Sequence, residues 1–266
     1  MATDEDALFL PDGERFIPTE LTRGPWTREA QHGGPPAALL ARAIEHTADG
    51  NGMMVARLTV ELLRPVPVSP LTVTARTTRP GRKVQLIEAS MSAGDVEVAR
   101  ATGLRIRTTE LPLPDLTDAA NAPRPPESGT TSQPPWAQAV SYRSFHRDAV
   151  EHRFVAGSFE TPGPATDWIR LRVSLVPGEP TSPLSRVAAA ADFGNGVSWT
   201  LSRNEGYVFI NPDLTIYLHR EPADEWVCLE AVTWPQPNGV GLAESRLWDR
   251  RGPIGRSLQS LLLERH

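Results

Sequence analysis

Hydrophobic and polar residues alternate along several short stretches in the first half of the chain. Four runs of β-branched and apolar residues show partial period-two alternation, and they cover Val60–Leu63, Leu71–Thr77, Val84–Ser92 and Val96–Ile106. Turn residues separate the runs at 65–67, 79–81 and 93–95. Short alternating runs bounded in this way are typical of antiparallel strands joined by tight connections. The pattern therefore predicts a meander.

Two segments rich in small apolar residues predict helices. In 35–44, two prolines stand where a first helical turn tolerates them, and apolar residues occupy nearly every face. In 182–192, Ser182 is a suitable N-cap, Pro183 takes the first helical position, and a run of alanines follows. Alanine lets a sheet approach a helix closely. We therefore expect each helix to be buried against a curved antiparallel sheet.

Prolines mark the organisation of the chain. Of the 266 residues, 26 are proline, and seven of these lie in 111–135 among aspartate, serine, threonine and glycine. Such a stretch has few backbone donors and little apolar surface to bury. We interpret 111–135 as a linker between an N-terminal domain, 1–110, and a C-terminal domain, 136–266.

The two halves repeat each other at a fixed offset of 156 residues. The segment Leu58–Arg64 lies over Leu214–Arg220, and the alignment then runs without a gap to Ile106 over Leu262. It contains 10 identities in 49 positions. An ungapped repeat on both sides of a linker indicates a duplicated domain. The sequence thus predicts an α+β protein in which one helix and one curved antiparallel sheet occur twice.

Composition and charge exclude several functions. With 27 basic and 32 acidic residues, the net charge is -5 and the pI is near 5.7, so nucleic acid is not an expected partner. The single cysteine, Cys228, excludes an internal disulfide and fits a reducing compartment. Residues 1–6 are acidic, unlike a signal peptide, and no apolar run reaches the roughly 18 residues of a membrane span. We expect a cytoplasmic protein.

The sequence contains no motif that binds a metal ion or a phosphate-bearing cofactor. The six histidines show no close pair at a helical metal-ligand spacing, and there is no Walker loop. The segment Gly196–Thr200 lacks the second glycine of a serine hydrolase elbow. We therefore expect neither a metal ion nor a cofactor, and no serine nucleophile.

Four motifs of the second half occur in a characteristic order, at 190–196, 211–220, 225–226 and 255–261. Together they resemble the double hot-dog acyl-CoA thioesterases related to bacterial thioesterase II. The resemblance covers about 18–264 apart from the linker. It implies a tandem hot-dog fold, in which each half wraps a sheet around its central helix. It also implies an enzyme of lipid metabolism that hydrolyses an acyl-CoA thioester to free acid and CoA without a covalent intermediate.

The resemblance further implies a set of catalytic residues. In the thioesterase II relatives, an Asp on the second helix, a Thr, and a Gln near the chain end hold the attacking water. By position, the Asp is Asp192 and the Gln is Gln259. The position aligned with the Thr is Asn211, whereas Thr215 lies four residues further on, so both remain candidates. A carboxylate orients or deprotonates a water molecule, and neutral amides hold it by hydrogen bonds.

A glycine-rich segment in front of the first helix is the candidate site for the oxyanion. It contains His32, Gly33 and Gly34, and it resembles the His-Gly-Gly signature of the single-domain phenylacetate-pathway hot-dog thioesterases. Unpaired N–H groups and the dipole at a helix start favour negative charge. We assign His32 to substrate binding or to a structural hydrogen bond, because the mechanism does not require an imidazole.

The same signature predicts how many sites each chain has. In those relatives, the catalytic acid lies nine residues after the His, but this position in the first half is Ala41. In the second half, Pro183 stands nine residues before Asp192, so the acid is present and the glycines are not. Because such hot-dog dimers combine glycines from one subunit with the acid from the other, we predict one composite site, with Gly33 and Gly34 facing Asp192.

Other functions remain as alternatives. An enoyl-CoA hydratase of the same fold is disfavoured, because Val197 stands where that family has a His. A non-catalytic hot-dog protein that binds acyl-CoA or lipid remains open, because Asn211 replaces the family Thr. Arg64 and Arg220, which the repeat pairs, are candidates for contacts with anionic CoA or for salt bridges at the rim. The sequence leaves a homodimer or a larger homo-oligomer open.

Overall fold

A computed structural model describes residues 7–47, 52–113, 122–135, 141–202 and 205–265 of the chain. The strands in these residues are β1 (Phe9–Asp12), β2 (Arg15–Pro18), β3 (Met53–Leu62), β4 (Leu71–Arg79), β5 (Val84–Ala93), β6 (Val96–Arg107), β7 (Thr130–Ser132), β8 (Val150–Ser158), β9 (Thr161–Leu171), β10 (Tyr207–Ile210), β11 (Asp213–Leu218), β12 (Trp226–Pro235), β13 (Val240–Asp249) and β14 (Gly252–Arg265). The helices are α1 (Gly34–His46), α2 (Pro183–Ala191) and α3 (Gly194–Val197), with shorter turns η1 (Glu20–Thr22), η3 (Pro126–Ser128) and η5 (Phe145–Ala149).

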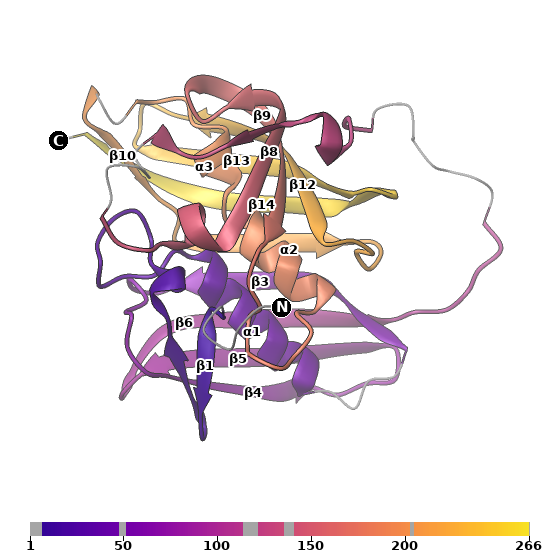
Figure 1. Cartoon of the computed structure of the whole chain (residues 1–266). Helices are drawn as coiled ribbons and strands as arrows, with labels where there is room; N and C mark the ends of the chain where they lie inside the picture. Colours follow the sequence, from indigo (N-terminus) through magenta and orange to yellow (C-terminus); the bar gives the residue numbers. More distant parts are fainter. Residues whose placement is uncertain (1–6, 48–51, 114–121, 136–140, 203–204, 266) are drawn as a thin grey trace.

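Within the described residues, the strands join into one 14-stranded sheet. Its order is β1-β2-β4-β5-β6-β3-β11-β14-β13-β12-β9-β8-β7, and β10 pairs with β14 beside this path. The strand pairs are all antiparallel. Figure 1 shows the first half of the chain below and the second half above, with the helices α1 and α2 in front of the sheet near the middle of the view.

The meander predicted for the first half is confirmed. Strands β4, β5 and β6 begin at Leu71, Val84 and Val96, as the alternating pattern predicts. Strand β3 is longer than predicted, because it begins at Met53 rather than at Val60. A bulge between Val55 and Arg57 shifts the register against β6 at this point. The extra residue interrupts the alternation and conceals the first part of the strand.

The offset of the sequence repeat also relates the strands of the two halves. When it is added to the bounds of β5, the result is Val240–Asp249, which is β13. The start of β6, moved by the same offset, is the start of β14 at Gly252. The weak identity between the halves therefore reflects the same succession of strands.

The two halves meet where β3 pairs with β11. In this register Thr59 lies opposite Thr215, which is the residue that repeats it, and the two hydroxyl oxygens are 3.4 Å apart. A strand that pairs antiparallel with its own repeat is related to it by an approximate two-fold axis. This axis passes between the two threonines. The pairing of β3 with β11 joins the two halves into one continuous sheet.

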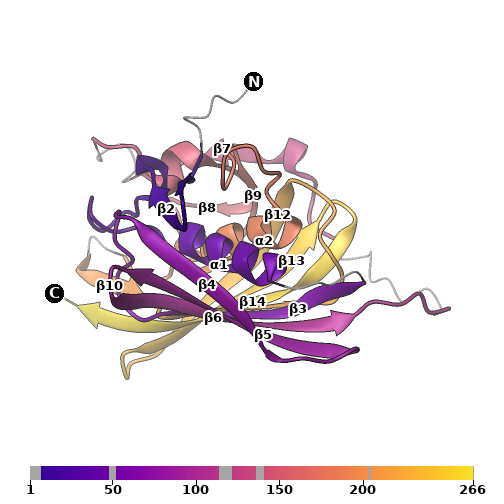
Figure 2. The same cartoon turned by 90° about the horizontal axis from the view of Figure 1, so that it is seen from below.

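Helices α1 and α2 pack against each other on one face of the sheet (Figure 2). They run antiparallel, since the start of α1 contacts Ala189 near the end of α2, and Ser185 Oγ donates to the Ala38 carbonyl oxygen at 3.1 Å. Helix α1 also contacts β3, β4, β5 and β6, while α2 contacts β9, β11 and β12. The predicted burial of both helices is confirmed, and the alanines allow the close approach.

Part of the predicted linker belongs to the sheet of the second half. Strand β7 pairs with β8, and Trp168 Nε1 donates to the Arg124 carbonyl oxygen at 2.8 Å. Residues 114–121 of the predicted linker lie outside the described residues. Strand β7 consists of Thr and Ser, so no alternation of apolar residues reveals it.

Candidate active site

The start of α1 lies against the end of α2, where Gly33 and Gly34 approach Asp192 and Ala189. Gly33 is the N-cap of α1, and Pro35 and Pro36 follow Gly34, so this helix begins with few N–H groups. The Gly34 N–H lies 3.1 Å from His32 Nδ1 and also contributes a hydrogen bond to the Asp192 carboxylate. Among the described residues, no protein acceptor is found for the Gly33 N–H, and Gly33 lines the cavity described below.

Asp192 is the residue that ends α2, and its side chain turns back toward the start of α1. His32 Nδ1 lies 2.8 Å from Asp192 Oδ2, and Asn211 Nδ2 donates to Asp192 Oδ1 at 2.7 Å. Gln259 Nε2 donates to the same Oδ1 and to the Asp192 carbonyl oxygen, both at 3.2 Å. The four residues come from α2, β14 and two loops, and the carboxylate has a hydrogen-bond donor on each of its oxygens.

The surroundings of Asp192 determine its ionisation. Burial alone would raise the pKa of this carboxyl, since a charged group loses its hydration. The positive charge and hydrogen bond of His32, the Asn211 amide and the Gly34 N–H all lower this pKa, and together they outweigh the effect of burial. The pKa of Asp192 is therefore lower than usual, and the side chain is a carboxylate at neutral pH.

The Gln259 side chain binds Asp192 through hydrogen bonds. Its side chain is 1% exposed on β14, and its Oε1 accepts a hydrogen bond from the Asn195 N–H at 3.2 Å. With both ends of the amide bound to protein groups, Gln259 lies behind the carboxylate and does not line the cavity. That Gln259 holds the water directly stays a prediction, and these contacts favour a role in which Gln259 positions Asp192.

Two aromatic rings pack against the imidazole of His32. Its ring centroid lies 4.5 Å from that of Phe193 and 5.1 Å from that of Phe145. Phe193 follows Asp192 directly, and Phe145 stacks on it with centroids 5.6 Å apart. The same cluster therefore holds both partners of the ion pair. The sequence analysis missed Phe145 and Phe193, because this packing joins segments that are distant along the chain.

A cavity of about 520 Å³ opens beside Asp192. Its lining includes His32, Gly33, Asp192 and Asn211, so one wall is polar. Most of the remaining lining is apolar, and it consists of Pro25, Trp26, Pro134, Pro135, Phe159, Phe193, Trp199, Leu201 and Phe209. A volume of several hundred cubic ångströms with a few converging polar groups is typical of a small-molecule site.

Gly33 and Asp192 are in direct proximity. A Cβ added to Gly33 would lie 2.7 Å from Asp192 Oδ2 and 2.8 Å from Oδ1. A Cβ added to Gly34 would lie 2.6 Å from the Ala189 carbonyl oxygen. Only glycine allows the two helix ends to approach so closely. The structure thus brings both glycines to the second-half acid.

Thr215 lies on the other face of the sheet. It pairs with Leu258 on β14, and neighbouring residues of a strand point to opposite faces, so Gln259 and Thr215 point in opposite directions. The Thr215 hydroxyl faces Thr59 instead, as described above. Of the two candidates for the family Thr, Asn211 contacts Asp192 and Thr215 does not. Two residues four apart point to the same face only when both lie in one continuous strand. Strand β11 begins at Asp213, so Asn211 precedes it and does not have to share the face of Thr215.

The opposite end of the helix pair holds almost no cavity. There the end of α1 meets the start of α2 around a space of only about 20 Å³. Arg42 Nε and Nη2 each donate to a Glu179 carboxylate oxygen at 2.7 Å, and Ser182 Oγ donates to Glu45 at 2.5 Å. Of the two ends of this helix pair, as far as the described residues show, only the Asp192 end joins a carboxylate to a large cavity.

The two arginines paired by the repeat lie outside this cavity. Arg220 binds the buried Asp249 carboxylate through Nη1 at 2.7 Å and Nη2 at 2.5 Å. Arg64 is exposed and does not line the cavity. In the described part of the chain, no group of three or more His, Cys, Asp or Glu side chains is arranged to hold a metal ion. No helix there is long and apolar enough to cross a membrane.

Comparison with known families supports an assignment. The profile of the acyl-CoA thioesterase C-terminal domain matches residues 116–263, and that of the acyl-CoA thioesterase N-terminal domain matches residues 22–106. The chain therefore belongs to the acyl-CoA thioesterase family and is a thioester hydrolase, which confirms the resemblance inferred from its motifs. Comparison with curated proteins finds no match.

Solved structures show the fold. A thioesterase II candidate from Thermobifida fusca YX is 17% identical with a TM-score of 0.75, and the match covers 98% of this chain and 97% of that one. A protein of unknown function with a hot-dog fold from Alicyclobacillus acidocaldarius is 18% identical with a TM-score of 0.70, over 99% and 98% of the chains. Acyl-CoA thioesterase II TesB2 from Mycobacterium marinum is 16% identical with a TM-score of 0.68, over 96% and 94%. The chain has a hot-dog fold.

Proposed function

We propose that the protein hydrolyses acyl-CoA thioesters to free acid and CoA by means of a water molecule activated at Asp192. The observation that carries this proposal is the ionised Asp192 carboxylate on the wall of a 520 Å³ cavity, next to the start of α1. The apolar lining suits an acyl group, and the polar wall suits the thioester. Membership of the acyl-CoA thioesterase family supports the choice of substrate.

In the proposed reaction, Asp192 and Asn211 hold the water beside the thioester carbonyl. The water oxygen bonds to the carbonyl carbon while its proton passes to Asp192. The Gly33 N–H at the helix start stabilises the oxyanion of the tetrahedral intermediate. When the C–S bond breaks, the proton passes to the CoA sulfur, so the products are a carboxylic acid and the thiol, and no covalent enzyme intermediate forms.

Gln259 and His32 act on the reaction through Asp192. Gln259 fixes the Asp192 carboxylate and its backbone, which keeps the water-binding oxygen aimed into the cavity. His32 holds the other carboxylate oxygen and keeps Asp192 ionised. Its role in this proposal is to position the acid.

The proposed site requires a tandem arrangement of two hot-dog units in the chain. The repeat of the strands, the pairing of Thr59 with Thr215 and the two packed helices support a tandem of two hot-dog units, each with its sheet around its own helix. The glycines of the first unit and the acid of the second then form one composite site. The cytoplasmic location and a homo-oligomeric state remain proposals that rest on the sequence alone.

Release of CoA thiol from a panel of acyl-CoAs of different chain length tests the function. The protein's own thiol, Cys228, is fully buried and burial raises its pKa well above the ordinary value, so a thiol reagent reports the released CoA. We expect steady release with at least one acyl chain. Tight binding of acyl-CoA without any release would instead favour the non-catalytic acyl-CoA or lipid binder.

A further inference from the structure

An exposed loop at the rim of the cavity carries an arginine with no acidic partner. Pro25, Trp26 and Gln31 of this loop line the cavity, and Arg28 lies between them in the sequence and is exposed. Among the described residues, no carboxylate lies within ion-pair distance of Arg28; its contact is with the ring of Tyr142, whose centroid is 5.4 Å from the guanidinium. Arg15, Arg76 and Arg250 are exposed and have acidic partners, while the exposed Arg64 and Arg82 do not line the cavity.

The Tyr142 ring contacts two guanidinium groups, of which that of Arg23 is paired with Glu20 and that of Arg28 is not paired with a carboxylate of the described residues. Arg23 approaches the same ring, with its guanidinium 5.6 Å from the centroid, and the Tyr142 hydroxyl donates to the Gly24 carbonyl oxygen at 3.4 Å. The ring therefore ties the loop to the segment that precedes η5. A guanidinium above an aromatic face is held in place without losing its hydrogen-bond donors.

An unpaired arginine beside the cavity matters because the protein is acidic and its proposed substrate is an anion. The net charge is -5, and the substrate class proposed above carries a pyrophosphate and a 3′-phosphate. Phosphate recognition needs cationic donors near the mouth, and guanidinium matches phosphate in a bidentate manner. Arg220 does not provide it, because it is bound to Asp249.

We propose that Arg28, held against Tyr142 beside Arg23, binds the phosphate groups of CoA at the mouth of the cavity. This inference rests on the proposed function, since it assigns the part of the substrate that lies outside the acyl cavity. The reacting groups at Asp192 are separate from it, so loss of Arg28 weakens binding and leaves the chemical step unchanged.

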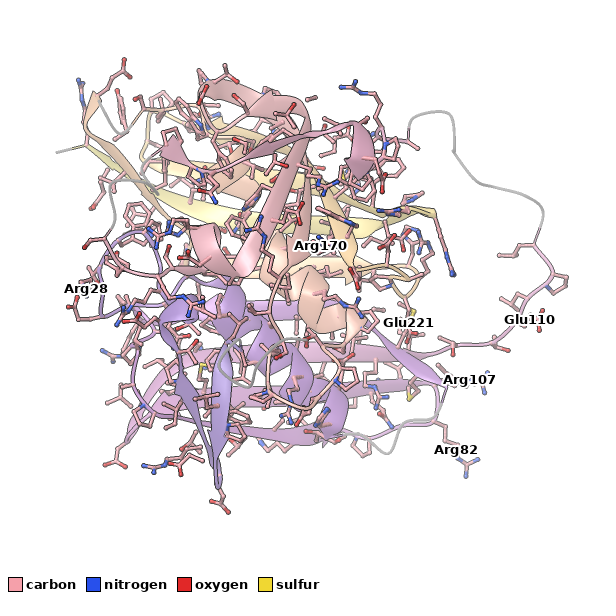
Figure 3. The ribbon with its side chains drawn as sticks, in the orientation of Figure 1. Arg28, Arg82, Arg107, Glu110, Arg170 and Glu221 are labelled. Atoms are coloured by element: carbon pink, nitrogen blue, oxygen red, sulfur yellow. The ribbon has the colours of Figure 1, made fainter. Side chains whose placement is uncertain are left out.

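Two substrates with the same acyl group test the proposal, namely the acyl-CoA and the acyl N-acetylcysteamine thioester, which lacks phosphates. In Arg28→Ala, we expect the KM for acyl-CoA to rise about tenfold, the effect of one charge-assisted contact, with kcat unchanged. The KM for the truncated thioester stays at the wild-type value. Arg82→Ala removes the same charge on the opposite side of the molecule and leaves both KM values unchanged (Figure 3).

An unchanged KM for acyl-CoA in Arg28→Ala would overturn the proposal, and so would an equal rise with both substrates, which indicates a distorted loop. Binding of adenosine 3′,5′-bisphosphate, measured by calorimetry, is independent of turnover. We expect it to weaken in Arg28→Ala and not in Arg82→Ala. If the wild-type protein hydrolyses neither thioester, the proposed function fails, and the bisphosphate still decides whether Arg28 recognises phosphate.

Discussion

Gly33, at the start of α1, lies against the Asp192 carboxylate at the end of α2, so closely that a Cβ on Gly33 would come within 2.7 Å of Oδ2. This contact joins the first half of the chain to the second at the proposed reaction centre. In the proposed mechanism, Asp192 has to keep its position between His32, Asn211 and Gln259 to orient the water. The contact therefore gives a direct test of the composite site.

Gly33→Ala is expected to displace the carboxylate and to lower kcat on the order of 100-fold, as a shift of about 1 Å in a catalytic group does. The backbone at Gly33 has φ -66° and ψ -23°, which alanine adopts without strain, so the fold is kept. Steady-state kinetics with an acyl-CoA and a thermal melt measure both effects. A folded variant with the wild-type kcat would show that Gly33 is not part of the site.

Asn211 and Thr215 can be separated by substitution. Asn211→Leu removes the amide that donates to Asp192 Oδ1 at 2.7 Å, and we expect kcat to fall about tenfold. Thr215→Val removes a hydroxyl on the opposite face of the sheet, and we expect kcat to stay within about twofold of the wild-type value. The reverse order of effects in the same assay would mean that Thr215 replaces the family Thr.

The lowered pKa of Asp192 predicts a pH dependence of stability. An unfolded Asp titrates near pH 3.9, and the native carboxyl titrates below its ordinary value. The ionised side chain therefore stabilises the fold fully above about pH 4, and this contribution is lost as pH falls through the native pKa. We expect the difference in melting temperature between wild type and Asp192→Asn to shrink between pH 5 and pH 3. A difference that grows toward low pH would contradict the direction of the shift.

Local patterns in the sequence predict part of this fold well. The starts of β4, β5 and β6 and both long helices follow from alternation, turn residues and proline at the first helical turn. These features depend on neighbours in sequence, so a pattern can reveal them. The fixed offset between the halves, which the pairing of Thr59 with Thr215 reproduces in space, also follows from the sequence.

Other elements have no such local signal. Strand β9 contains Pro162, Gly163 and Pro164, and its pairing with β8 is interrupted by two register shifts, so neither strand shows a regular alternation. Strands β1 and β2 form a short hairpin that also lacks a clear pattern.

For the candidate site too, the sequence identifies some features and not others. Motif resemblance identified Asp192, Gln259, Asn211, Gly33 and Gly34, and the structure brings them together. Motif resemblance could not show that His32 is paired with Asp192, or that both ends of the Gln259 amide are bound to protein groups. Both facts depend on contacts between segments that only the tertiary structure brings together.

The central claim is that the Asp192 carboxylate activates water for thioester hydrolysis. The most direct measurement is the rate at which Asp192→Asn releases CoA from the best wild-type substrate, with a thermal melt to show that the variant is folded. We predict a kcat lowered by about 100-fold or more, the usual effect of losing a general base, with acyl-CoA still bound. A folded variant that releases CoA at the wild-type rate would contradict the account.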